Sequence, residues 1–210
     1  MNAMKLILVR HGETEWVKEH RYQGSTDIPL NVWGVRQARA LARLLKKERP
    51  LAVYSSKLTR ARETAKLIAN TCGKSIQFDA RLNEVSFGVW EGQVHAVVRA
   101  QSPKASRDWY RARWSSRPPG GESLHSLRRR IFAFLKELAE QFGNRDGSCV
   151  VVTHGGPIRM FLIQLLKTDP KIFWRLRIDP ASVTRINLNR GQVELILLNG
   201  REHLNGLKRN

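Results

Sequence analysis

The chain lacks the features that mark disulfide scaffolds and membrane proteins. It has 2 cysteines among 210 residues, and Cys72 and Cys149 lie far apart, without the spacing of a metal motif. No apolar run approaches the roughly 18 residues of a membrane span. The start, from Met1 to Leu8, has only a short apolar run and no cleavage-like site. We therefore expect two core thiols in a cytoplasmic protein with no membrane partner.

Acidic residues are scarce relative to basic ones. The chain has 18 Asp and Glu against 37 Lys and Arg, which gives a formal net charge of +19. Such a balance attracts anions, and phosphorylated metabolites, nucleic acid and membrane surfaces all qualify. A solvated, arginine-rich surface also accounts for part of the excess, so composition alone does not choose among these partners.

Strand-like and helix-like patterns alternate along the chain, without internal repeats or low-complexity tracts. Asn31 is a plausible helix N-cap, Gly73 and Gly143 are plausible helix ends, and Pro157 suits a first helical turn. This alternation predicts an α/β fold: a three-layer sandwich with a mostly parallel central sheet and helices on both faces. The strands are expected at 5–10, 51–56, 148–153, 182–188 and 193–199, and the helices at 31–48, 57–73, 126–143 and 157–166.

The least regular region is 93–121, which is rich in Arg, Trp, Ser and Pro. We expect a single domain over 1–210 with this region as a lid-like insertion, part helix and part loop, over one edge of the sheet. From Arg99 to Arg130 there are nine basic residues and only two acids, Asp108 and Glu122. These basic residues fit either of two interpretations: they belong to a lid that favours substrates with a second negative group, or they form a solvated basic face.

Marked polar residues follow three of the predicted strands. They are Arg10–Gly12, Ser55–Ser56 with Arg60 in the next helix, and His154–Gly156. Since ligands bind at the carboxyl ends of parallel strands, these residues should meet at one rim of the sheet. Two histidines and two arginines without a neighbouring carboxylate or thiolate favour an anion over a metal ion. Glycines at helix starts add backbone N–H groups that suit phosphate.

Six blocks of sequence then occur in a familiar order. The chain resembles the histidine phosphatase (phosphoglycerate mutase-like) superfamily from Leu6 to about Leu204. The blocks that carry the resemblance are RHGETEW, GSTDIPLNVWGVRQA, SSKLTRARETA, LNEVSFGVWEG, PGGES and VVVTHGGPIR.

The resemblance implies a metal-independent phosphomonoesterase without a cofactor, acting on a small phosphorylated metabolite. His11 would be the nucleophile that becomes a phosphohistidine, and Arg10, Arg60 and His154 would hold the phosphoryl oxygens. Glu84 would act as general acid and then as general base. The positions that match the substrate pocket of the family are Gly12, Thr14, Gln23, Gly24 and Gly155.

The chain departs from the family pattern at one position. Val17 stands where the family often has asparagine, which removes one phosphate donor and predicts weaker ground-state binding or a shifted substrate choice. The motifs FGVWEG and PGGES, together with the short chain, favour the phosphatase branch over a cofactor-dependent phosphoglycerate mutase. A homodimer is common for this fold.

A different class of function is a basic nucleic-acid-binding protein on an inactive phosphatase scaffold. The net charge and the segment RDWYRARW favour this alternative, and the complete set of catalytic positions argues against it. Trp90 and Trp109 could pack in the core or touch substrate. Four further histidines are expected to be surface or structural residues: His20, His95, His125 and His203.

Overall fold

The computed structural model describes residues 4–143, 145–189 and 192–209; the ends of the predicted 1–210 domain, residue 144 and residues 190–191 lie outside the described residues. The strands are β1 (Met4–Arg10), β2 (Ala52–Ser55), β3 (Ile76–Phe78), β4 (Gly147–Thr153), β5 (Val183–Asn189) and β6 (Gln192–Gly200). The α-helices are α1 (Glu15–Lys18), α2 (Val32–Leu45), α3 (Thr59–Cys72), α4 (His95–Gln101), α5 (Pro103–Tyr110), α6 (Leu124–Phe142) and α7 (Gly155–Leu165). The 3₁₀ turns are η1 (Lys46–Glu48), η2 (Ala80–Leu82), η3 (Gly88–Trp90), η4 (Pro170–Arg175) and η5 (Glu202–Leu204).

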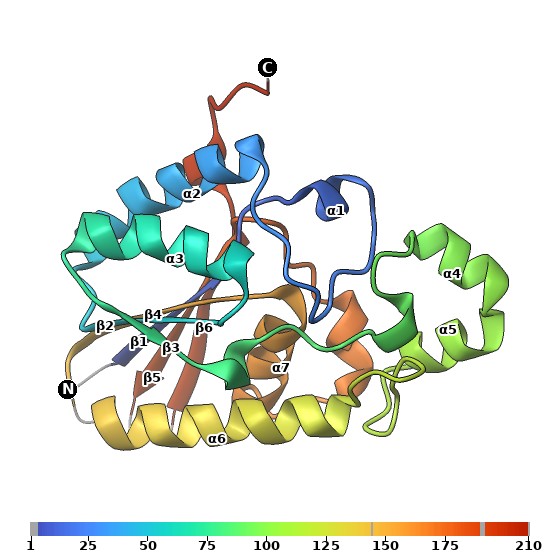
Figure 1. Ribbon diagram of the computed structural model, residues 1–210. Helices are drawn as coiled ribbons and strands as arrows, with labels where there is room; N and C mark the ends of the chain where they lie inside the picture. The colour runs from blue at the N-terminus through green and yellow to red at the C-terminus, as the bar shows by residue number, and fades with distance from the viewer. Residues whose placement is uncertain (1–3, 144, 190–191, 210) are drawn as a thin grey trace.

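The strands form one sheet in the order β3-β2-β4-β1-β5-β6. The pairs β1–β4, β2–β4 and β2–β3 are parallel, and β5 pairs antiparallel with both β1 and β6. Helices α2 and α3 cover one face, and α6 and α7 cover the other (Figure 1). The predicted α/β fold with a mostly parallel sheet and helices on both faces is confirmed.

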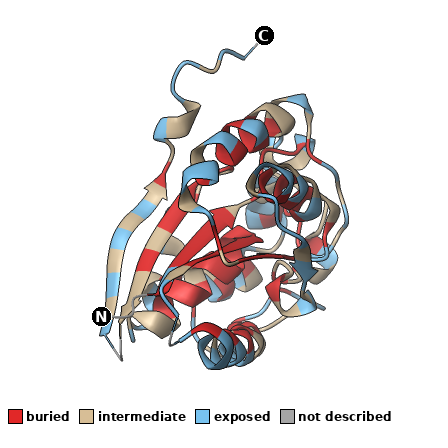
Figure 2. Cartoon of the chain, turned by 90° about the vertical axis from the view of Figure 1, so that its left-hand side faces the viewer, coloured by how far each residue is buried: buried red, intermediate tan, exposed pale blue. Residues whose placement is uncertain are grey.

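The central strands are buried on both sides, which explains their continuous apolar sequences. In β1, Leu6 and Leu8 belong to the core under α6 and α7, whereas Ile7 and Val9 belong to the core under α2 and α3. This alternation follows from the two-residue period of a strand. Figure 2 shows the buried strands between helices whose outer faces are exposed.

Several helix boundaries follow from the residues that cap them. The Asn31 side chain accepts a hydrogen bond from the Gly34 N–H at the start of α2, and Gly73 ends α3 in the left-handed conformation, with φ 63°. Both predicted caps are confirmed. Helix α7 begins at Gly155, two residues before Pro157, and the three-residue strand β3 was not predicted because it is short and mostly exposed.

The insertion contains the helices α4 and α5, but it does not lie over an edge of the sheet. Figure 1 shows both helices on the side of the molecule opposite to the start of β1, beyond the carboxyl ends of the parallel strands. The expectation of an edge position was wrong. Sequence spacing identifies an insertion but not the direction in which it leaves the sheet.

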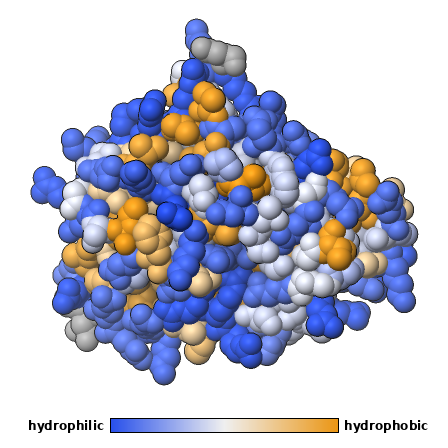
Figure 3. Space-filling view, in the orientation of Figure 1, coloured by the Kyte–Doolittle hydropathy of each residue, from blue (hydrophilic) through white to orange (hydrophobic). Residues whose placement is uncertain are grey.

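The face of the molecule seen in the orientation of Figure 1 is mainly polar. Hydrophilic residues cover most of the face drawn in Figure 3, and apolar residues lie there in separate patches. Among the described residues no helix is long and apolar enough to cross a membrane.

Two glycines bring the loop after β1 against the start of α2. A Cβ atom on Gly12 would lie 2.5 Å from the Gly34 carbonyl oxygen, and a Cβ atom on Gly34 would overlap the carbonyl oxygen of Glu13. The Asn31 N–H also donates to the Glu13 carbonyl, at 3.0 Å. The absence of both side chains therefore allows the backbone segment next to His11 to rest on the helix.

We expect Gly34→Ala to lower the free energy of unfolding by about 1–2 kcal/mol. Alanine improves helix propensity by about 1 kcal/mol, but its Cβ overlaps backbone atoms of Glu13, so we expect overpacking to cost about 2–3 kcal/mol, the upper part of its usual range, and to displace the loop after β1. Urea unfolding measures the net effect. Arg39→Ala, an exposed change on the same helix, is the control. A Gly34→Ala protein as stable as the wild type would contradict the close contact.

Candidate active site

Two histidines meet at the ends of adjacent parallel strands. The register pairs Arg10 of β1 with Thr153 of β4, so His11 and His154 are the next residues on each strand. The His11 N–H donates to the Thr153 carbonyl at 3.0 Å, and the two imidazole centroids are 5.0 Å apart. The chain leaves β1 toward α2 on one face and leaves β4 into α7 on the other, which is where open α/β sheets form a crevice.

The surroundings of His11 determine its tautomer. Its Nδ1 lies 2.6 Å from the Gly12 carbonyl oxygen, which can only accept, so Nδ1 carries the proton. Burial, and then the charges of Arg60 and Arg10, hold the pKa of His11 well below its ordinary value. The imidazole is therefore neutral near pH 7, with the free lone pair on Nε2.

Two arginines, Arg60 fully buried and Arg10 half-buried, supply positive charge beside the histidines. Arg10 donates from Nη1 to the Ile178 carbonyl at 2.6 Å, and Arg60 donates to the carbonyls of Thr26 and Gly24 at 2.8 and 2.7 Å. The Nε atoms of both arginines are buried without a partner among the described residues. Burial lowers the pKa of Arg60 to about 10, which still leaves it charged at neutral pH. These unused N–H groups are available to an anion.

Glu84 belongs to the loop after η2, and its side chain contacts the start of α7. Its Oε1 accepts from the N–H groups of Val85 and Gly156, at 2.9 and 3.0 Å, and a Cβ atom on Gly156 would overlap that oxygen. Glycine at 156 therefore allows the carboxyl group to reach the helix N-terminus, next to Gly155. The five predicted catalytic positions are brought together by four segments: the end of β1, α3, the loop after η2 and the start of α7.

The predicted pocket residues have mixed environments. Thr14 donates to Gln23 Oε1 at 3.0 Å and accepts from the Val17 N–H, so its hydroxyl supports a loop. The Gly24 carbonyl holds Arg60. The N–H of Gly12 was expected to be free at a helix start, but it donates to Thr64 Oγ1 at 3.2 Å.

Above these groups the structure has a pocket of about 700 Å³. Gln23, Gly24, Gly155 and Val17 line it, and so do Arg10 and Glu84. Trp90 and Trp109 do not; their side chains are buried in the core. The lining also includes residues that the sequence motifs did not indicate, among them Trp33, Tyr110, Arg159, Trp174, Arg201 and Arg209.

The basic residues of the insertion do not face this pocket. Of the described residues from Arg99 to Arg130, only Tyr110 lines it. Arg130 is paired with Glu122, and the other basic residues of this region are exposed. The interpretation as a solvated basic face is therefore the better one.

Arg159 shares with Arg10 a feature that most other cations of the pocket lack. Lys18, Arg21, Arg201 and Arg209 each have a carboxylate partner, whereas no ion pair is formed by Arg159 within the described ranges. Its Nε donates to the Leu176 carbonyl at 2.9 Å, and its guanidinium lies over the rings of Trp174 and Phe173, 5.3 and 5.7 Å from their centroids. Arg159 is one helical turn after Gly155, and this spacing in HGGPIR is the signal that could have identified it.

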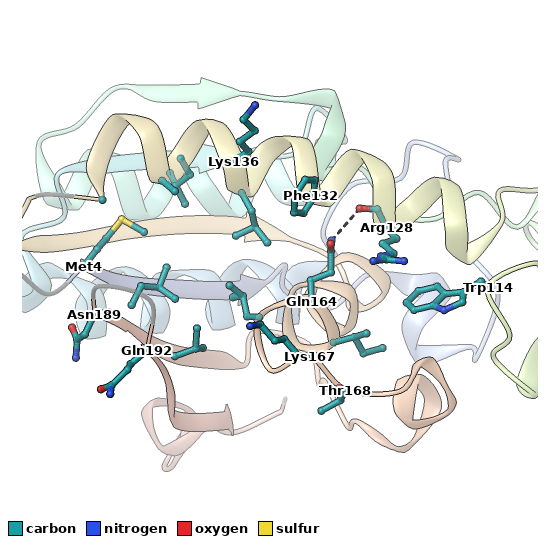
Figure 4. Close-up of a pocket in the computed structure, with 18 residues that line it drawn as sticks. Met4, Trp114, Arg128, Phe132, Lys136, Gln164, Lys167, Thr168, Asn189 and Gln192 are labelled. Atoms are coloured by element: carbon teal, nitrogen blue, oxygen red, sulfur yellow. Dashed lines mark hydrogen bonds between the residues drawn. The ribbon is translucent and has the colours of Figure 1, made fainter.

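A second cavity, of about 720 Å³, lies away from these groups (Figure 4). It is formed by α6, the end of α7, the strands β5 and β6, and Met4 at the start of β1. Because it is at the amino end of β1, it does not share the strand-end position typical of α/β active sites. Within the described residues, no group of three or more His, Cys, Asp or Glu could hold a metal ion.

Comparisons with known proteins agree with this geometry. Residues 6–201 match the family model described as histidine phosphatase superfamily (branch 1). Phosphoserine phosphatase 1 of Hydrogenobacter thermophilus is 35% identical over 201 residues, which cover 96% of this chain and 94% of that protein. Glucosyl-3-phosphoglycerate phosphatase of Mycolicibacterium vanbaalenii is 37% identical over 172 residues, 79% of this chain and 76% of that protein. A phosphoserine phosphatase mutant from Entamoeba histolytica, solved with phosphoserine, aligns with a TM-score of 0.86 and 29% identity, covering 96% of this chain and 99% of that chain.

We expect the protein to lose stability as the pH falls below 6.5. The pKa of His95, which stacks on Tyr22, is lowered to about 4 by burial and by Arg99, and those of His11 and His154 are also lowered. Between pH 6.5 and 4 the unfolded chain therefore binds protons that the native state does not. For His95 alone the loss at pH 5.5 is about 1 kcal/mol.

Urea unfolding at pH 7.5, 6.5 and 5.5 measures this dependence. His95→Gln should make the free energy of unfolding depend less on pH, and His125→Gln, at an exposed position, is the control. A free energy of unfolding that stays constant from pH 7.5 to 5.5 would contradict the assignment of neutral buried histidines.

Proposed function

The chain belongs to the histidine phosphatase superfamily, branch 1, and from this premise we propose that it hydrolyses phosphate monoesters of small metabolites through a phosphohistidine on His11. One observation carries the proposal. A neutral histidine with a free Nε2 lies beside two arginines whose buried Nε–H groups have no partner among the described residues. Such a site attracts a phosphoryl group and presents a nucleophile to it.

In the first step, Nε2 of His11 attacks phosphorus while the bond from phosphorus to the ester oxygen breaks. The proton of Glu84 passes to the departing oxygen, so the leaving group is an alcohol. Arg10 and Arg60 stabilise the charge on the equatorial oxygens, which is the main requirement of a loose phosphoryl-transfer transition state.

In the second step, the Glu84 carboxylate takes a proton from water, and the water oxygen attacks phosphorus as the bond to His11 Nε2 breaks. Inorganic phosphate leaves, and Glu84 is protonated again. The N–H groups of Val85 and Gly156 hold the carboxylate near the start of α7 in both steps. Neither a metal ion nor a cofactor is required.

The pocket also suggests a substrate class. Arg159 has no carboxylate partner among the described residues, and its pKa is lowered to about 10 by burial and then by Arg10, while Glu84 acts in the opposite direction. We infer that it binds a carboxylate close to the ester, as in phosphoserine or a phosphoglycerate. The two named phosphatase relatives are consistent with this class. The side chain of Val17, at the pocket wall, cannot form a hydrogen bond where that of an asparagine would.

The alternatives concern the fate of the phosphohistidine and the role of the charge. A mutase returns the phosphoryl group to the substrate. Because the probable phosphoglycerate mutase of Salmonella paratyphi C is 33% identical over 190 residues, the experiment below also tests for mutase activity. In the other alternative the scaffold is inactive and the exposed arginines of the insertion bind nucleic acid.

We further propose that residues 1–210 form one domain with the insertion at 93–121, and that the protein is a homodimer with a cytoplasmic location. The free thiols of Cys72 and Cys149 are compatible with a reducing compartment.

We expect the protein to release phosphate from monoesters in the presence of a chelator, and we expect His11→Ala to abolish the release because no phosphohistidine can form. The panel contains an aryl phosphate, phosphoserine, 3-phosphoglycerate and α-ribazole phosphate. His125→Ala, a change at an exposed histidine, is the control. Equal activity of His11→Ala and wild type would exclude the mechanism. Salt-sensitive nucleic-acid binding without turnover would favour the binding protein, and isomerised phosphoglycerate would favour the mutase.

Arg159→Gln should raise KM for phosphoserine about 10- to 100-fold, because a charge-assisted hydrogen bond is worth about 1.5–3 kcal/mol. Its effect on an aryl phosphate without a carboxylate should be less than about threefold. Arg128→Gln removes an exposed arginine near the insertion and is the matched control. An equal loss with both substrates would mean that Arg159 is structural, and a selective loss in Arg128→Gln would restore the insertion as the anion-binding element.

A further inference from the structure

A chain of hydrogen bonds connects His154 to the backbone of the neighbouring loop. His154 Nε2 is 2.8 Å from Ser56 Oγ, and Ser56 Oγ is 2.9 Å from Asn83 Oδ1. The backbone N–H of Lys57 donates to the same Asn83 oxygen at 3.0 Å, and the N–H of Leu58 donates to Ser56 Oγ at 3.2 Å. Ser56 and His154 have no solvent exposure.

These bonds permit only one arrangement of protons. The Lys57 N–H is always a donor, so the side-chain atom of Asn83 that it meets is the carbonyl oxygen, an acceptor. Ser56 must then donate its single hydroxyl proton to that oxygen. His154 Nε2 faces a hydroxyl oxygen whose proton is already used, so Nε2–H is the donor in this pair.

The other ring nitrogen of His154 has no partner. Nδ1 is buried and forms no hydrogen bond with any described residue. The charged and titratable groups that influence the imidazole are Arg60 from α3, His11 and Arg10 from the end of β1, and Arg130 from α6. With burial as the largest cause, all of them lower the pKa of His154, so Nδ1 of the free protein holds a lone pair instead of a proton.

His11 has the opposite tautomer. Its proton is on Nδ1, bound to the Gly12 carbonyl, and its lone pair is on Nε2. Two imidazoles 5.0 Å apart thus have distinct capacities: one can attack phosphorus, and the other can accept a proton. A bare Nδ1 would repel a phosphoryl oxygen until that proton arrives.

We propose that the Lys57 N–H, Asn83 and Ser56 fix His154 with Nδ1 unprotonated, and that Nδ1 takes up one proton when a phosphoryl group binds. The inference rests on the proposed function for the identity of the ligand. A dianionic group binds together with a proton from solvent, or a monoanionic group transfers its P–OH proton to Nδ1. Either way, Nδ1–H then donates to a phosphoryl oxygen, and the proton is released when phosphate leaves. Ser56 and Asn83 are positioning residues in this scheme.

The first test observes the protons directly. Protein labelled with ¹⁵N-histidine is studied by NMR at pH 7.5, and the signals absent from His154→Gln identify His154. We expect Nε2 protonated and Nδ1 bare in the free protein, and both protonated at saturating inorganic phosphate. A proton on Nδ1 before phosphate is added, or a bare Nδ1 afterwards, would overturn the proposal.

The second test measures the binding of inorganic phosphate from pH 7.5 to 9.0, where free phosphate is mainly the dianion. Uptake of one proton weakens the wild-type Kd about tenfold per pH unit. Asn83→Ala frees the Ser56 hydroxyl to donate to His154 Nε2, which moves the imidazole proton to Nδ1. We therefore expect its Kd to change less than about threefold over this range.

Asn70→Ala, at an exposed position of α3, is the matched control and should keep the wild-type slope. If Asn83→Ala does not fold, Ser56→Ala serves as the second variant that breaks the hydrogen-bond chain, and its His154 should show mixed tautomers in the NMR test. A wild-type Kd that does not change with pH, or an unchanged pH dependence of Kd in these two variants, would disprove the proposal. Because neither test uses turnover, an inactive protein that still takes up the proton would contradict the proposed function and leave this inference standing.

Discussion

The constraint on which the rest of the site depends is that a buried and a half-buried arginine have no carboxylate partner among the described residues. Arg10 and Arg60 are held by carbonyl oxygens, which compensate their N–H groups only in part. A buried charge is costly unless it is paired, so the pocket favours an anion. Burial, and after it the same charges, lowers the pKa of His11 and of His154 and keeps both imidazoles neutral. Attraction for phosphate and the availability of a nucleophile thus both follow from one buried, positively charged environment.

Much of this site could be predicted from the sequence because its members lie at strand ends. The apolar runs before His11 and His154 identify two buried strands, and parallel pairing then brings both histidines together. Asn31 and Gly73 were equally predictable because caps act within a few residues. The motifs supplied the roles of these residues, and those roles remain proposals.

The features that could not be predicted depend on contacts between distant segments. Arg159 is distinguished by its contact with Trp174 and by forming no ion pair with a described residue, and neither can be deduced from a local pattern. The position of α4 and α5 beyond the strand ends depends on how the chain turns after η3. The tautomer of His154 depends on Asn83, which lies 71 residues earlier in the chain. The hydroxyl of Ser56 connects the two side chains by hydrogen bonds.

The ion pair between Arg209 and Glu13 has a practical consequence for work with the protein. It joins the last described residues to the loop next to His11, and Arg209 itself lines the pocket. Replacing Arg209 would therefore remove a cation from the pocket wall and release the Glu13 carboxylate at the same time. Met4 lies at the opposite end of β1, so a change there would leave this ion pair intact.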